Sequence, residues 1–129
     1  MNIRQIKETS LYIHDLEAAY VFYHGKLGLP LISRAEGRHI FFRAGTSVLL
    51  CFISEATSKE TRLPPHFGAG NQHLAFEVSS QDYDACKERM KDKSIDIIHE
   101  ETWEGGLRSF YFKDPEENVL EIVEAGMWD

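Results

Sequence analysis

An internal repeat constrains the fold of this 129-residue chain more than any other feature of its sequence. One copy covers residues 6–53 and the other covers residues 73–123, so that the copies are offset by about 65 residues. Superposing them places residues 8–13 on 73–78 and residues 48–51 on 119–122. A repeat of this length indicates two copies of one supersecondary unit. The chain is therefore expected to fold as two similar modules.

Both copies predict the same order of elements. In the first, Asp15 is a predicted N-cap of a helix with apolar positions at helical spacing, and Gly28 ends that helix. In the second, a helix begins at Ser79 or Ser80. Strands are predicted at residues 6–13, 29–35, 39–44 and 47–53 of the first copy and at residues 73–78, 95–100, 107–113 and 119–123 of the second. Each copy is thus a βαβββ module.

Alternating helices and strands are also typical of a parallel α/β sheet. The turns between successive strands here are too short for parallel crossovers, which favours antiparallel pairing. We therefore predict an α+β fold in which two βαβββ modules, related by a pseudo-twofold axis, form a mixed sheet. In this prediction residues 1–129 are one domain, with modules at 1–53 and 73–129 and a linker at 54–72. A loop of that length is often functional, and we expect it to help close a pocket through His66 and Phe67.

The charge of the chain limits its partners. A formal net charge of −7 disfavours a nucleic-acid surface, which needs clustered Lys and Arg, and it suits neutral or cationic small ligands. No apolar run approaches the 18 or more residues of a membrane span, and residues 1–5 lack the apolar core of a signal peptide. We expect a cytoplasmic protein that does not bind membranes.

Strand alternation places three candidate ligands on equivalent faces. Glu8 lies opposite the apolar face formed by Leu11 and Ile13, and His73 occupies the matching position of the second copy. Glu121 lies on a strand face that is otherwise apolar, where a charge is costly unless it is paired, hydrogen-bonded or bound to a metal. If the modules curl toward each other, Glu8, His73 and Glu121 meet. The alternatives are a solvated Glu8 and a hydrogen-bonded structural His73.

Three segments together carry a family resemblance. They are residues 11–16 with Phe22-Tyr23 and residues 27–29, then residues 73–78, then residues 112–121. With these the chain resembles the vicinal oxygen chelate superfamily, which includes glyoxalase I, methylmalonyl-CoA epimerase, fosfomycin-resistance proteins, extradiol dioxygenases and bleomycin-binding proteins. The resemblance implies a U-shaped sheet around one divalent metal, and a homodimer. Its ligand positions correspond here to Glu8, Leu50, His73 and Glu121, of which Leu50 cannot bind a metal.

One imidazole and two carboxylates would leave metal positions open for water or substrate. Such a set suits Zn, Mn, Fe, Ni or Mg, and the metal would polarise substrate oxygens. We predict a metal-dependent lyase or isomerase with Glu8 and Glu121 as catalytic carboxylates. The side chains expected to bind substrate are Tyr12, His66, Trp103, Arg108 and Tyr111. A metal-free bleomycin-resistance-type binding protein is the alternative, followed by a fosfomycin-resistance-type transferase or a dioxygenase.

Overall fold

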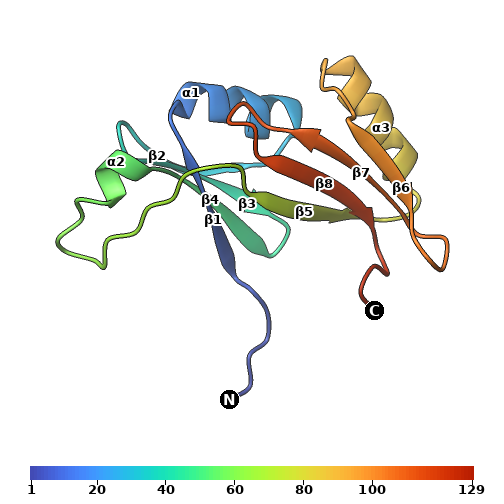
Figure 1. The fold of residues 1–129 in the computed structure, drawn as a ribbon, viewed down its shortest axis with the longest axis horizontal. Coiled ribbons are helices and arrows are strands. Elements are labelled where there is room, and N and C mark those ends of the chain that lie inside the picture. The colour runs from blue at the N-terminus through green and yellow to red at the C-terminus, as the bar shows by residue number, and fades with distance from the viewer. The chain divides into compact units, whose positions relative to one another are not determined.

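The computed structural model describes all residues, 1–129, as two compact units (Figure 1). Unit 1 comprises Met1–Gly70 and unit 2 comprises Asn71–Asp129. Each unit contains one four-stranded mixed sheet and its own helices. The predicted fold class, α+β with two βαβββ modules, is confirmed. No helix combines the length and apolar character that a membrane crossing requires.

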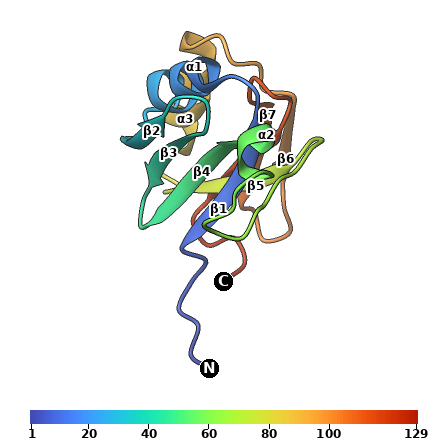
Figure 2. The ribbon, with the colours of Figure 1, turned by 90° about the vertical axis from the view of Figure 1, so that its left-hand side faces the viewer.

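Unit 1 holds its strands in the order β1-β4-β3-β2 (Figure 2). β1 pairs with β4 in parallel, whereas β4, β3 and β2 are antiparallel neighbours. The elements of unit 1 are β1 (Glu8–Ile13), α1 (Leu16–Ala19), the π-helix η1 (Tyr20–Lys26), β2 (Leu31–Ala35), β3 (His39–Ala44), β4 (Ser47–Ile53) and α2 (Ser54–Thr57).

The helical segment of unit 1 begins and ends where the sequence predicts. The Asp15 side chain accepts a hydrogen bond from the Ala18 amide and so satisfies a donor at the helix start. Gly28 adopts a positive φ of 80° just after the segment, a conformation in which a Cβ would be strained. η1 packs on one sheet face, where the Tyr23 and Phe42 ring centroids are 5.4 Å apart. The core of unit 1 lies between these elements.

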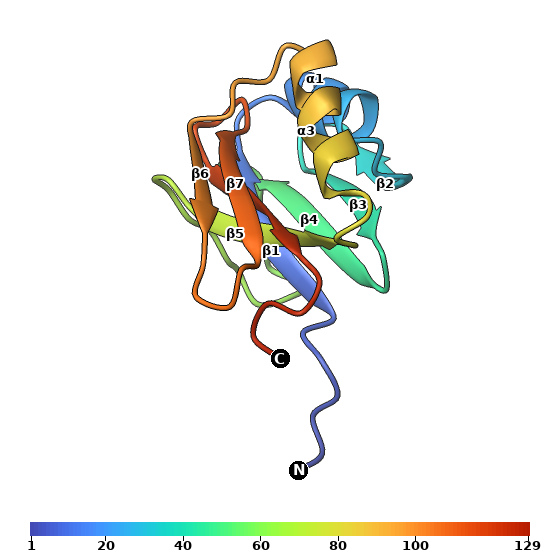
Figure 3. The same cartoon turned by 90° about the vertical axis from the view of Figure 1, so that its right-hand side faces the viewer.

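Unit 2 repeats this plan with the strand order β5-β8-β7-β6 (Figure 3). Its elements are β5 (His73–Val78), α3 (Tyr83–Asp92), β6 (His99–Thr102), β7 (Arg108–Lys113) and β8 (Val119–Glu124). α3 covers the sheet face that presents Phe110, whose ring contacts Tyr83 edge-on at 5.4 Å. Phe110, Phe112 and Leu120 are fully buried there. We call this the helix face of unit 2, and the opposite one the site face.

The strand registers confirm the alignment of the repeat. In unit 1, β1 begins with Glu8 opposite Val48, and in unit 2, β5 begins with His73 opposite Val119. Two residues further along each pair, Leu50 and Glu121 occupy equivalent positions. The two copies therefore differ at equivalent positions of the same module, where Glu8 matches His73 and Leu50 matches Glu121.

Several predicted element boundaries differ from the structure. β6 begins at His99, four residues after its predicted start, because the chain is irregular from Ile95 to Ile98. α3 begins at Tyr83, since Ser79 forms a turn in which it accepts from the Asp82 amide. The predicted linker contains α2 and folds back onto unit 1: the Ser54 hydroxyl donates to the Gly68 carbonyl at 2.7 Å.

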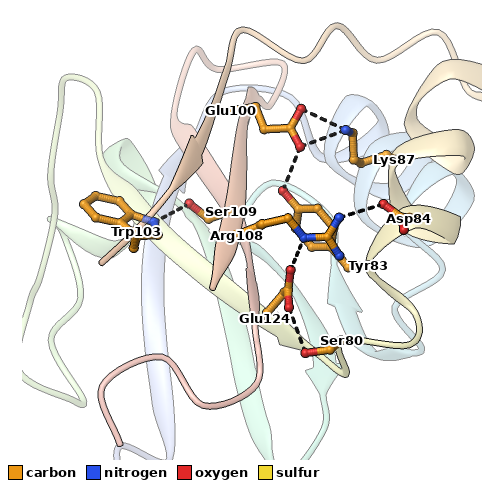
Figure 4. A network of polar contacts seen from close by, with 9 residues as sticks. All are labelled: Ser80, Tyr83, Asp84, Lys87, Glu100, Trp103, Arg108, Ser109 and Glu124. Atoms are coloured by element: carbon orange, nitrogen blue, oxygen red, sulfur yellow. Dashed lines mark hydrogen bonds and ion pairs between the residues drawn. The ribbon is translucent and has the colours of Figure 1, made fainter. Parts of the chain in front are cut away.

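A polar network fastens α3 to its sheet (Figure 4). The Arg108 guanidinium donates to Glu124 and to Asp84, and it lies over the Tyr83 ring at 4.3 Å. The Ser80 hydroxyl donates to Glu124 at 2.8 Å. The hydrogen bond from Ser80 and the Arg108 guanidinium lower the pKa of Glu124 below its usual 4.5. Glu124 is thus a buried carboxylate that stays ionised.

This network predicts acid sensitivity of unit 2. Because the pKa of Glu124 is lowered in the folded state, its contribution to the free energy of unfolding is present above pH 4.5 and is lost as the pH falls below that value. Glu124→Gln should therefore flatten the pH dependence of stability below pH 4.5, measured by urea unfolding at a series of pH values. Glu104→Gln, at an exposed position between β6 and β7, is the control and should retain the wild-type slope. An unchanged slope in Glu124→Gln would contradict the assignment.

Candidate functional site

The site face of unit 2 brings together His73, Glu121 and Tyr111 from three adjacent strands. The Nε2 of His73 lies 3.4 Å from the Oε1 of Glu121, and Tyr111 pairs with Glu121 in the strand register. Glu121 is buried, whereas about half of the His73 side chain is exposed. Burial and the charge of the neighbouring Glu121 raise the pKa of Tyr111. Tyr111 therefore stays protonated at neutral pH and can donate a hydrogen bond.

The tautomer of His73 follows from its second contact. Its Nδ1 lies 2.8 Å from the Val119 carbonyl oxygen, which can only accept, so Nδ1 carries a proton. In the neutral imidazole, Nε2 then presents a lone pair toward the Glu121 carboxylate. Two acceptors at 3.4 Å repel each other unless a proton or a cation lies between them. A ring nitrogen fixed in this way by a backbone carbonyl is the usual arrangement of a metal-binding histidine.

A buried turn holds His73 in place. The Asp114 Oδ1 accepts from the Asn118 amide at 2.9 Å, and the Asn118 side-chain nitrogen donates to the Asp114 Oδ2 at 2.9 Å. The Oδ1 of Asn118 accepts from the Gln72 amide, also at 2.9 Å. Since Gln72 precedes His73 and Asn118 precedes Val119, this turn joins the starts of β5 and β8. It sets the position of the imidazole relative to Glu121.

Asn118→Ala should lower the free energy of unfolding of the protein by about 1–3 kcal/mol, because Asn118 is 1% exposed and its loss leaves the Gln72 amide without its acceptor. Thermal unfolding followed by circular dichroism measures this loss. Glu117→Ala, an exposed position of the same turn, is the control and should change stability far less. Equal stability of the two variants would show that the turn does not anchor β5.

Other side chains of the site face lie on β6 and β7. The His99 ring is 5.8 Å from the Tyr111 ring, and the His99 Nε2 is 2.7 Å from the Glu101 carboxylate. The Trp103 indole donates to the buried Ser109 hydroxyl at 2.9 Å (Figure 4). The predicted substrate residues Tyr111 and Trp103 are therefore on the site face. Sequence reasoning assigned His99 a structural or surface role because it has no spaced partner, and Glu101 lies just beyond the predicted strand at residues 95–100.

Arg108 is separated from these residues. It lies on the helix face, paired with Glu124 and Asp84, whereas Glu121 lies on the site face. The structure does not bring this predicted substrate-binding side chain to Glu121. The alternation of β7 was the signal, since Arg108 shares the parity of the buried Phe110 and Phe112.

In unit 1, Glu8 is exposed on β1, on the same face as Tyr12. The Tyr12 hydroxyl and the His66 Nδ1 share a hydrogen bond of 2.9 Å, so two predicted substrate-binding residues do meet. Phe67, which was expected to help close the same pocket, is 69% exposed. Because Glu8 belongs to unit 1 and its predicted partners to unit 2, the convergence of Glu8 with His73 and Glu121 stays a prediction.

The residues of unit 2 fit a divalent metal. His73 offers a neutral Nε2 with a fixed lone pair, and Glu121 offers a buried anionic oxygen next to it. Neither unit alone gathers three His, Cys, Asp or Glu side chains in a metal-binding arrangement. Unit 2 thus supplies two candidate ligands, and a third would have to come from elsewhere.

Comparisons with known proteins agree with the fold. The chain matches the model of the Glyoxalase/Bleomycin resistance protein/Dioxygenase superfamily over residues 5–122. The glutathione transferase FosA of Serratia marcescens is 27% identical over 120 residues, which cover 93% of this chain and 80% of that protein. The crystal structure of lactoylglutathione lyase from Agrobacterium tumefaciens has a TM-score of 0.92 at 32% identity and covers 98% of each chain.

A glyoxalase/bleomycin resistance protein/dioxygenase from Nocardioides has a TM-score of 0.75 at 26% identity, covering 98% of this chain and 87% of its own. The family model spans nearly the whole chain, from before β1 into β8. Both modules, and with them Glu8, His73 and Glu121, fall within the match. The chain therefore belongs to the Glyoxalase/Bleomycin resistance protein/Dioxygenase superfamily.

Proposed function

We propose that this protein is a divalent-metal-dependent lyase or isomerase that acts on a small oxygenated substrate. The observation that carries the proposal is the His73–Glu121 pair, in which a fixed imidazole lone pair faces a buried carboxylate at 3.4 Å. Glu8 is the proposed third ligand. When bound, the metal would polarise substrate oxygens and stabilise negative charge on them. Zn, Mn, Fe, Ni and Mg all suit this nitrogen and oxygen set.

The protein's own groups have distinct roles in this proposal. Val119 holds the imidazole, and the Asp114–Asn118 turn holds both strands that carry the ligands. Tyr111 can donate a hydrogen bond to a substrate oxygen beside Glu121. Glu8 and Glu121 are the proposed carboxylates for moving a proton. The Trp103 indole borders the same face. Two copies of the chain are proposed to form a cytoplasmic homodimer, as in small members of the superfamily.

Metal binding is the first test. Chelator-treated protein titrated calorimetrically with Zn²⁺ and with Mn²⁺ should bind one ion per chain, and the His73 Nε2 nitrogen resonance should shift on saturation. The loaded protein is then assayed for turnover of S-lactoylglutathione, the compound in the name of the Agrobacterium relative, and for glutathione transfer. If neither Zn²⁺ nor Mn²⁺ binds at millimolar concentration, the proposal is wrong.

The third ligand can be tested separately. Glu8→Gln should weaken Zn²⁺ binding about tenfold, since an amide oxygen is a poorer ligand than a carboxylate. Glu77→Gln is the matched control, because Glu77 is an exposed glutamate on the same strand face as His73 but is not a proposed ligand. Calorimetry measures both affinities. Equal affinities for Glu8→Gln and wild type would remove Glu8 from the site.

A metal-free binding protein of the bleomycin-resistance type is the alternative, and the net charge of −7 favours it because that charge attracts a cationic drug. Titration with bleomycin in the presence of EDTA distinguishes the two functions. Tight drug binding without metal, together with absence of ion binding, would select the alternative.

A further inference from the structure

Five rings cluster on the face of the unit 1 sheet opposite η1. We call them the ring cluster, and they are Tyr12 of β1, His39 and Phe41 of β3, Phe52 of β4 and His66 of the segment after α2. Each touches at least one other, with centroid separations from 4.0 Å to 6.4 Å. The sequence placed Tyr12 and His66 in a substrate site but did not identify the other three. Alternation along β3, where Ile40 and Phe42 are fully buried, was the available signal.

The rings of the cluster contact one another in two geometries. The His39 and Phe41 rings are nearly parallel, at 10° and 4.0 Å. Phe52 stands almost perpendicular to Phe41 at 5.3 Å, and His66 stands almost perpendicular to Phe52 at 4.6 Å. Phe52 is 5% exposed, and the other four rings are half-buried. The cluster thus contains both stacked and edge-on contacts, the two geometries in which aromatic rings prefer to pack.

Neighbouring polar groups keep the His39 ring neutral and balance the charge of Arg38, which lies over the Phe52 ring. Arg38 donates to the Nδ1 of His39 at 2.6 Å, so the remaining proton of His39 is on Nε2, directed to the Ser33 hydroxyl at 3.3 Å. Burial and the adjacent Arg38 lower the pKa of His39, which keeps this imidazole neutral. The Arg38 charge is balanced by Glu60 at 3.2 Å, and the Arg38 hydrogen bond lowers the pKa of that carboxyl.

A small occupant suits this surface better than a protein partner. Four half-buried rings expose far less than the roughly 800 Å² per partner that a stable protein interface buries. The Tyr12 hydroxyl and the His66 Nδ1 form a polar edge beside the rings, where a single hydroxyl or carbonyl could exchange hydrogen bonds. A hydrophobic surface with a few placed polar groups is typical of ligand sites.

We propose that the ring cluster of unit 1 binds an uncharged aromatic ring of a small molecule, packed against His39 and Phe41 with its polar substituent toward Tyr12 and His66. The proposal stands on unit 1 alone and does not depend on a metal in unit 2. An aliphatic group of equal size would gain the hydrophobic contact but not the ring–ring interaction, which is worth about 0.5–1.5 kcal/mol. That difference corresponds to a preference of about threefold to tenfold.

Benzyl alcohol and cyclohexylmethanol are the probes, because they share the hydroxymethyl group and differ in whether the ring is aromatic. Each is titrated into the whole protein, with EDTA present, while the imidazole and aromatic side-chain resonances are followed by NMR. Benzyl alcohol should shift the His39, Phe41 and His66 signals and bind at least about threefold more tightly. Equal affinity of the two alcohols, or shifts confined to other residues, would overturn the proposal.

Two variants test whether benzyl alcohol binds at the ring cluster. Phe41→Leu keeps an apolar side chain and should reduce the preference for benzyl alcohol to below about twofold. Tyr20→Leu removes a half-buried aromatic ring of η1 outside the cluster and should retain the preference. Circular dichroism confirms that both variants fold. If a second copy of the chain covers the cluster instead, the His39 and Phe41 signals will move with protein concentration and not with benzyl alcohol, and the proposal is wrong.

Discussion

Replacing His73 by alanine is expected to weaken Zn²⁺ binding at least about 100-fold. The imidazole is the single nitrogen donor of the proposed set, and its Nδ1 contact with Val119 orients the Nε2 lone pair toward Glu121 before any ion arrives. Its removal takes away both a metal bond and this pre-organisation, and loss of an orienting contact alone typically costs 10-fold to 100-fold in affinity. Competition with a chromophoric chelator measures affinities in this range.

His99→Ala is the matched control for that measurement. His99 is also a half-exposed histidine of the site face and also pairs with a glutamate, at 2.7 Å from Glu101, but it is not a proposed ligand. It should bind Zn²⁺ within about twofold of wild type. Full metal occupancy in His73→Ala would show that the ion, if any, is bound elsewhere. Equal losses in both histidine variants would point to a general surface effect in place of a defined centre.

Phe110→Ala is expected to lower the free energy of unfolding by about 3–5 kcal/mol, the usual cost of truncating a fully buried phenylalanine. Its ring is fully buried, contacts Tyr83 of α3 edge-on at 5.4 Å and lies 6.0 Å from the Phe112 ring. No neighbouring backbone can fill the space of a deleted ring in a sheet held on both sides by β6 and β8. Urea unfolding, followed by fluorescence and circular dichroism, measures the change.

Ile98→Ala provides the control in the same unit. Ile98 precedes β6 and is 51% exposed, so its truncation should change stability by about 0.5 kcal/mol or less. A loss below about 1 kcal/mol in Phe110→Ala would contradict the assignment of the helix face as the core of unit 2. A changed dependence on urea concentration would instead indicate that unit 2 unfolds separately from unit 1.

The sequence predicted the fold through two local regularities. Alternation of apolar side chains identified the strands and correctly assigned Leu11 and Ile13 to the buried face. The repeat aligned Glu8 with His73 and Leu50 with Glu121, and the strand registers confirm these positions. Boundaries were less predictable. The turn before α3 depends on a local hydrogen bond from the Asp82 amide to Ser79, which competes with an earlier helix start, whereas the Ile98 amide before β6 donates to the Tyr111 carbonyl of a later strand.

The candidate site was predictable as far as the alternation of side chains along each strand. Parity along a strand assigns a residue to a face, so Glu121 and Tyr111 could be placed together. The same parity assigns Arg108 to the helix face, where Glu124 and Asp84 hold it, so grouping it with Tyr111 went against that signal. The sequence did not connect His39 and Phe41 with Phe52, whose ring contacts both, because Phe52 comes from a later strand.

The sequence by itself determined the two modules, the faces of their strands and the chemical asymmetry between them, because each depends on spacing within one copy. The tertiary structure decided what each polar group contacts. The Nδ1 of His73 donates to the carbonyl of Val119, 46 positions away, and this contact directs the Nε2 lone pair of the neutral imidazole toward Glu121. Such contacts arise only when the sheet closes, since pairing two distant strands brings together atoms that no local pattern relates.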